Sequence, residues 1–196
     1  MTKKLLHRAV ITCVILFSFG AGNLFALEDN FGRAREVEGR HFTIYYAPEV
    51  GLSGLIQSIN VGPLDKLMGG RGTQGSFSLE TELADILDTL FERICSILDM
   101  QLYSFKGNMK ICRDSRQLNY IYHQIFSNSP VNTTRSFYAI MNNTIYTSPE
   151  NFTLGVIGHE MAHAIISHYF VVLPSVKIQE LLSAYVEYQL RRAPSH

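Results

Sequence analysis

Residues 148–166 read SPENFTLGVIGHEMAHAII, and this stretch decides how the rest of the chain is interpreted. Ser148 suits a helix N-cap, Pro149 suits the first helical position, and apolar side chains continue to the end of the stretch. The stretch therefore predicts a helix. Residues four apart on a helix lie nearly above one another, so we expect His159 and His163 to reach a single metal ion.

Glu160 follows His159 directly in the sequence and is predicted to have a different task. Its side chain points about 100° around the helix from that of His159. From there a carboxylate can take a proton from a metal-bound water without becoming a ligand. The pattern H-E-x-x-H thus predicts two ligands and one general base; the alternative, a chance match, is rare at ordinary composition.

The next predicted helix offers a third ligand. Residues 176–190 carry apolar side chains at helical spacing, and Glu180 lies in the first half. With His159 and His163 it would form a set of three protein ligands, which leaves the fourth position of one zinc ion open to water. Glu187 lies two turns further along the same face and is predicted to orient a histidine N–H. The alternative makes both glutamates ordinary solvated carboxylates.

The remaining sequence mixes strand and helix patterns. Strands are predicted at residues 40–47, 108–113, 135–141 and 144–147. Further helices are predicted at residues 78–100, with Ser78 as the N-cap, and at residues 115–126. Asn142 and Asn143 suit the positive φ of a tight hairpin turn. Residues 51–75 contain seven glycines and predict a long loop or an insertion.

Composition narrows the class of protein. A chain of 196 residues with 46% hydrophobic and 17% charged residues suits one compact domain. Lysine plus arginine and aspartate plus glutamate both number 17, so no polybasic surface is expected to neutralise a phosphate backbone. Nucleic acid is therefore not an expected partner.

The first 26 residues are predicted to be a secretory signal peptide. Basic residues precede an almost wholly apolar run at residues 9–19, and small residues up to Ala26 suit cleavage. Residues 27–196 would then form a single exported domain, periplasmic or secreted. The alternative is an uncleaved anchor, because residues 9–27 are just long enough to cross a bilayer. A membrane contact is expected only in that case.

Cys95 and Cys112 are the two cysteines of the predicted mature chain. Export would allow them to form a disulfide, and two separate buried thiols are the alternative. They lack the Cys-x-x-Cys spacing of zinc sites, so they are not expected to bind the metal.

The motif and its spacing to Glu180, Tyr185 and Glu187 resemble the gluzincin peptidases, in which H-E-x-x-H precedes a pattern like E-G-x-A-x-Y. HFTIYY at residues 41–46 is similar to the opening strand of such domains, and SFYAIMNNTIYTS at residues 136–148 to their edge hairpin. The resemblance implies an α+β zincin fold. In that fold a mixed sheet with an antiparallel edge strand packs on the H-E-x-x-H helix, and a Glu-bearing helix follows.

The resemblance also implies roles for single residues. Ser136, Phe137 and Tyr138, on the edge strand, would pair with an extended peptide substrate. Many gluzincins place a tyrosine or histidine over the cleft to stabilise the oxyanion. Here the nearby downstream donors are Tyr185, Tyr188, Arg191 and Arg192, and none has a motif to recommend it. Leu181 and Ser183 replace the glycine and alanine that are usual in the family.

These features predict a zinc-dependent peptidase that hydrolyses polypeptides by general-base activation of a zinc-bound water. Glu160 would be the base and then the proton donor to the leaving amine. One alternative is a catalytically weak or inactive zinc-containing binding or scaffold protein of the cell envelope. Another is a deformylase-like amidase with the same motif, against which the leader and Glu180 argue.

Overall fold

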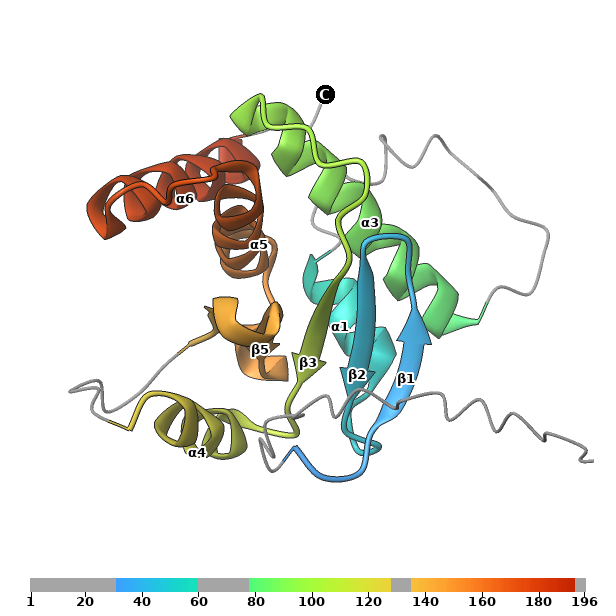
Figure 1. Ribbon diagram of the computed structural model, residues 1–196. Helices are drawn as coiled ribbons and strands as arrows, with labels where there is room; N and C mark the ends of the chain where they lie inside the picture. Colours follow the sequence, from blue (N-terminus) through green and yellow to red (C-terminus); the bar gives the residue numbers. More distant parts are fainter. Residues whose placement is uncertain (1–30, 60–77, 128–134, 193–196) are drawn as a thin grey trace, which may run out of the picture.

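The computed structural model describes residues 31–59, 78–127 and 135–192 (Figure 1). The predicted signal peptide, residues 1–26, lies outside the described residues, and so does most of the glycine-rich stretch, residues 60–75. The described part has an α+β fold, which confirms the predicted fold class at that level.

A five-stranded mixed sheet forms the centre of the fold, with strand order β1-β2-β3-β5-β4. The strands are Arg35–Glu38 (β1), Phe42–Tyr46 (β2), Gly107–Ile111 (β3), Phe137–Ala139 (β4) and Thr144–Thr147 (β5). β2, β3 and β5 are parallel, whereas β1 and β4 pair antiparallel at the two edges. Ile44, Met109 and Ile145 lie in register across the parallel strands and are fully buried.

Helices lie on both faces of this sheet (Figure 1). The five α-helices of the described residues are Leu52–Ile59 (α1), Leu79–Leu98 (α3), Ser115–Ile125 (α4), Leu154–Tyr169 (α5) and Val176–Arg192 (α6). Ile145 and Tyr146 are neighbours on β5 and point to opposite faces. Ile145 joins the core shared with α1, α3, α5 and α6, and Tyr146 joins the core shared with α4.

α3 follows its predicted bounds closely. The Ser78 hydroxyl accepts the Thr81 N–H at 3.2 Å, which satisfies one of the free donors at the start of the helix. Asp88, in the middle of α3, is a buried carboxylate that faces the β1–β2 turn. It accepts the backbone N–H of Arg40 at 2.6 Å and of His41 at 2.8 Å, and so ties the turn to the helix.

The helix that carries H-E-x-x-H begins later than predicted. Pro149 starts a short 3-10 turn, Pro149–Asn151, and Ser148 does not cap α5. The N-cap is Thr153, whose hydroxyl accepts the Val156 N–H at 3.4 Å. Ser148 instead accepts a hydrogen bond from the Asn151 amide, which holds the 3-10 turn in place.

The predicted hairpin is present, but its turn differs. Ile140–Asn142 forms a 3-10 turn, and Asn143 has a φ of 49°. Asn142 has no positive φ, so the prediction is confirmed for Asn143 and wrong for Asn142. The turn is closed by the Asn143 N–H, which donates to the Ile140 carbonyl.

Two elements were not predicted. β1 has the polar sequence REVE, which gives little strand signal. α1 lies inside the stretch predicted as a loop, and that prediction is wrong for Leu52–Ile59. The helix forms there because Leu55, Ile56 and Ile59 bury their side chains in the core with α3.

Of the two alternatives for Cys95 and Cys112, the structure shows two separate thiols, both free and buried. Cys95 lies near the end of α3 and Cys112 just beyond β3, in separate cores. β3 leads away from the end of α3, and its five residues extend about 16 Å. The thiols therefore lie at opposite ends of the strand.

No helix among the described residues is long and apolar enough to cross a lipid bilayer.

Candidate metal centre

α5 and α6 pack side by side, and two glycines on α5 allow their close approach (Figure 1). A Cβ atom on Gly158 would lie 2.2 Å from Cδ1 of Leu190, and one on Gly155 would lie 3.1 Å from Nε of Arg191. Their spacing of three residues puts both on one face of α5. The sequence prediction did not use these glycines, although this spacing just before the motif was a signal for close helix packing.

The close approach brings together the three predicted ligands, His159, His163 and Glu180. The two histidine Nε2 atoms lie 3.2 Å apart. Oε2 of Glu180 lies 3.5 Å from Nε2 of His159, and Oε1 lies 3.4 Å from Nε2 of His163. Two ring nitrogens from α5 thus face one carboxylate from α6.

These separations match the size of a zinc site. Zinc binds histidine nitrogen at about 2.0–2.1 Å, so the ligand atoms of a tetrahedral site lie about 3.3 Å from one another. The three measured separations are 3.2, 3.4 and 3.5 Å. The cluster can therefore hold one such ion without rearrangement of the helices.

Glu187 lies on the other side of His159. Its Oε2 is 3.6 Å from Nδ1 of His159, the ring nitrogen that points away from Glu180. Its other oxygen accepts a hydrogen bond from the Arg191 guanidinium. Glu187 is thus in place to orient the imidazole through Nδ1, and it is not among the three groups that face one another.

Glu160 is buried on the side of α5 that faces β4. Burial raises the pKa of its carboxyl group to about 8, a backbone hydrogen bond from Tyr138 acts in the opposite direction, and the charges of Glu180 and Glu187 raise it further. Burial likewise lowers the pKa of His163, as does the neighbouring His159, while Glu180 opposes them. His163 therefore favours the neutral form, which is the form that binds metals.

The strand predicted to meet substrate, β4, is at the sheet edge beside α5. Ser136 precedes it, and its hydroxyl donates to Oγ1 of Thr147 at 2.9 Å. Phe137 points to the α4 face, where its ring stacks on Tyr146. Tyr138 points to the α5 face, and burial raises the pKa of its hydroxyl. Strand alternation places Ser136 and Tyr138 on the side of the histidines and Phe137 on the other side.

The predicted oxyanion donors on α6 do not face the cluster. Tyr185 comes five residues after Glu180, which turns its side chain about 140° away around the helix. Tyr188 lies about 80° away, and its hydroxyl accepts a hydrogen bond from Nη1 of Arg192 at 2.6 Å. Arg191 is on the correct face, but it is bonded to Glu187.

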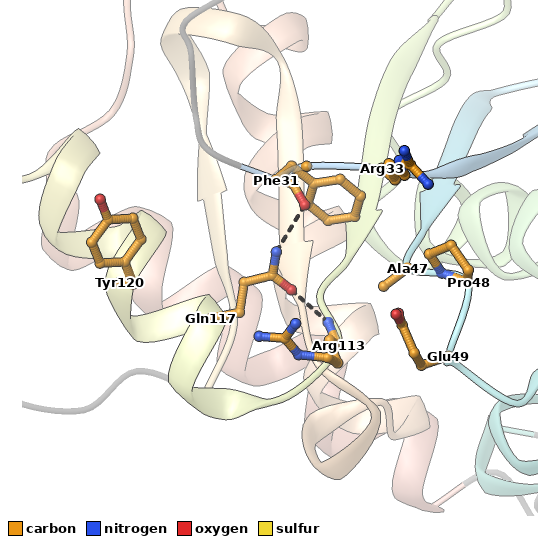
Figure 2. A pocket seen from close by; sticks show the side chains of 9 residues that line it. Phe31, Arg33, Ala47, Pro48, Glu49, Arg113, Gln117 and Tyr120 are labelled. Carbon is orange, nitrogen blue, oxygen red and sulfur yellow. Dashed lines mark hydrogen bonds between the residues drawn. The ribbon is translucent and has the colours of Figure 1, made fainter.

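A pocket of about 540 Å³ lies elsewhere, beside the carboxyl ends of β2 and β3 (Figure 2). The Gln117 amide spans part of its wall, donating to the Phe31 carbonyl at 2.8 Å and accepting the Arg113 N–H at 2.8 Å. The lining residues are Phe31, Gly32, Arg33, Ala47, Pro48, Glu49, Arg113, Gln117 and Tyr120. None belongs to the metal cluster, so the pocket is not part of that site.

No protein-family model, curated protein or solved structure matches this chain.

Proposed function

We propose that the chain is a zinc-dependent peptidase of the gluzincin type that hydrolyses peptide bonds in polypeptides. The observation that carries the proposal is the arrangement of His159, His163 and Glu180, whose facing atoms are separated by 3.2, 3.4 and 3.5 Å. Glu160 supports catalysis in addition to binding, since a purely structural site has no use for a further, buried carboxyl group beside the ligands.

The set of donors fits zinc. Two imidazoles and one carboxylate are typical of catalytic zinc sites, whereas closed structural sites use four ligands and often cysteine. Cys95 and Cys112 are buried in other parts of the fold and supply no thiolate here. When bound, a zinc ion supplies Lewis acidity, which makes water a nucleophile near neutral pH.

Glu160 is the proposed general base. Its carboxylate accepts a proton from the attacking water, whose oxygen bonds to the carbonyl carbon of the substrate. The carbon–nitrogen bond then breaks, and Glu160 returns the proton to the leaving amine. A cation held by the neighbouring histidines would favour the carboxylate form and so oppose the effect of burial on the Glu160 pKa.

β4 is the proposed binding edge for substrate. One edge of β4 pairs with β5, and an extended polypeptide can add to the other edge through backbone hydrogen bonds. The backbone hydrogen bond between Tyr138 and Glu160 supports this assignment, because it puts the edge strand beside the general base. Because these contacts involve the backbone, they would recognise the extended conformation of the substrate more than its side chains.

A second candidate is a zinc-containing binding or scaffold protein with little or no activity. The orientation of α6 favours it, because Tyr185 and Tyr188 are turned away from the cluster and Arg191 is bonded to Glu187. None of these three side chains is thus both free and directed at the cluster. This candidate shares the zinc site and differs in the outcome of the hydrolysis assay.

The test combines metal analysis with hydrolysis of fluorescently labelled, unfolded casein. We expect one zinc ion per chain, hydrolysis that 1,10-phenanthroline abolishes, and recovery on addition of zinc. Glu160→Gln should keep the zinc and reduce hydrolysis by about 100-fold or more. Glu82→Gln, a partly exposed glutamate in the first turn of α3, is the matched control and should retain full activity.

The outcomes separate the candidates. One zinc ion per chain without hydrolysis would favour the scaffold protein, and a chain without zinc would contradict both. Full activity in Glu160→Gln would contradict the role of Glu160.

We also propose that the chain is exported to the periplasm or the medium, because residues 1–26 have the composition of a signal peptide. N-terminal sequencing of protein from the native cell should find Leu27 or a residue near it. An intact Met1 on a protein free in the cytosol would contradict export.

A further inference from the structure

α6 carries a second apolar stripe, on the face turned away from the rest of the molecule. Its inward face buries Val186 and Leu190, as a helix on a protein surface normally does. The outward stripe recurs at helical spacing and is exposed along its whole length. It consists of Ile178, Leu181, Tyr185 and Tyr188.

The loop that leads into α6 adds exposed apolar side chains directly before the helix. Val171 is fully exposed, Val172 is 83% exposed, and the partly exposed Leu173 follows. Residues 161–176 contain no aspartate, glutamate, lysine or arginine. Because consecutive valines rarely remain in water without a function, the loop and the stripe together indicate a docking surface.

The acidic side chains of α6 lie on a different face of the helix from Lys177 and Arg192. Glu180 and Glu187 face the histidines. Arg192 lies at the centre of the outward stripe and Lys177 about 60° from it, and in α6 this face carries no carboxylate. Arg192 lies over the ring of Tyr188, with its guanidinium carbon 5.1 Å from the ring centroid. The outward face is therefore apolar, aromatic and cationic.

We propose that this surface, the 171–173 loop with the outward face of α6, docks on an anionic lipid bilayer. Exposed aliphatic side chains can enter the acyl region, tyrosines suit the headgroup level, and basic side chains bind anionic headgroups. A symmetric dimer through this face would oppose like charges at Lys177 and Arg192, which disfavours a second copy as the occupant.

This contact is distinct from a membrane anchor at the N-terminus. α6 and α4 lie at opposite ends of the molecule in Figure 1, and Phe31, where the described chain starts, packs with α4. Docking through α6 would hold the cluster at the bilayer surface, since Glu180 directly precedes Leu181. The docking surface needs neither zinc nor hydrolysis, so it can be tested independently of the proposed function.

The first experiment uses the absence of tryptophan from the chain. Val172→Trp introduces one fluorophore in the loop, and Tyr120→Trp, at an exposed position on α4, is the matched control. Vesicles of phosphatidylglycerol and phosphatidylcholine should shift the emission of the Val172→Trp variant to the blue and protect its fluorophore from acrylamide. Vesicles of phosphatidylcholine alone should act weakly, and the emission of the Tyr120→Trp variant should not change.

The second experiment measures sedimentation with the same anionic vesicles. Val171→Asp combined with Val172→Asp should weaken binding by about tenfold or more, because two carboxylates would meet the anionic surface. Tyr120→Asp adds one negative charge far from α6 and should bind as the unaltered chain does. Since both valines are exposed, the double variant should keep its far-ultraviolet circular dichroism.

Several results would overturn the proposal. The proposal is wrong if anionic vesicles do not change the emission of the Val172→Trp variant. It is also wrong if the double variant sediments with the vesicles as well as the unaltered chain does. Emission already shifted to the blue without lipid would mean that protein covers the surface, either another segment of the chain or, if the shift depends on concentration, a second copy. A shift caused by unfolded casein and not by vesicles would assign the surface to polypeptide.

Discussion

Histidine and carboxylate side chains meet in two parts of the molecule, and the two clusters differ in what their acceptors do. Between α3 and the β1–β2 turn, Asp88 accepts the backbone N–H groups of Arg40 and His41. Glu92 pairs with the Arg40 guanidinium, and its Oε1 lies 3.4 Å from Nε2 of His41. The acceptors of this cluster are therefore occupied by groups of the protein itself.

The cluster between α5 and α6 is arranged differently. The oxygens of Glu180 face Nε2 of His159 and Nε2 of His163, and the two ring nitrogens also face each other. Three donor atoms thus converge on one point, as metal sites require. Residue type alone therefore does not distinguish a structural cluster from a metal site, whereas the direction of the donor atoms does.

The largest effect is expected from Glu180→Ala, which removes one of three converging donors. Zinc binding should be nearly abolished, whereas Glu187→Ala should weaken it by only about 10- to 100-fold, because Glu187 acts through Nδ1 of His159. Competition with a chromophoric chelator measures both affinities. Full zinc occupancy in Glu180→Ala, with loss in Glu187→Ala, would reverse the two assignments.

Asp88→Ala tests the structural cluster. Two backbone N–H groups would lose a charged acceptor, so we expect the free energy of unfolding to fall by about 3 kcal/mol. Urea denaturation measures the loss, and the folded variant should still bind one zinc ion. Unchanged stability, or loss of zinc from a folded variant, would remove the distinction between the clusters.

Gly158→Ala tests how the second cluster is assembled. Its Cβ would lie 2.2 Å from Cδ1 of Leu190, and relief of that overlap should cost about 1–3 kcal/mol of stability. Because α6 must move, we also expect weaker zinc binding. Adding Leu190→Ala removes the clashing atoms and should recover part of the zinc affinity. If Gly158→Ala leaves both properties unchanged, close helix packing does not position Glu180.

The smallest effect is expected from Ser183→Ala, which introduces the residue usual in gluzincins. Ser183 is fully buried, and its hydroxyl has no hydrogen-bond partner in the described structure. Its removal should raise the free energy of unfolding by up to about 1 kcal/mol without changing zinc affinity. A clear loss of stability would show that the hydroxyl is satisfied.

Local patterns allowed much of the fold to be predicted. The apolar spacing of α3 and its cap at Ser78 were sufficient to predict that helix. The β-branched and aromatic content of β2 was sufficient to predict that strand. β1 was missed because its sequence, REVE, gives a single inward apolar side chain, Val37. α1 was missed because the surrounding glycines hid three buried apolar positions, a burial that depends on contact with α3.

In the site, too, some features were predictable from local sequence and others depend on contacts between elements. The relation of His159 to His163 is fixed by helix geometry and was predictable from the motif. The approach of Glu180 depends on contact between two helices, through Gly158 and Leu190, so the helix pattern made Glu180 a candidate ligand but could not place it beside the histidines. The direction of Tyr185 followed from helix geometry alone but was not considered: five residues from Glu180 correspond to a turn of about 140°.

X-ray absorption at the zinc edge of the purified full chain shows whether His159, His163 and Glu180 bind zinc. The proposed site predicts nitrogen and oxygen ligands alone at about 2.0–2.1 Å, with outer scattering from two imidazoles. Glu180→Ala should lose this signal or change it. Sulfur ligands at about 2.3 Å, or a chain that holds no zinc, would contradict the assignment of His159, His163 and Glu180.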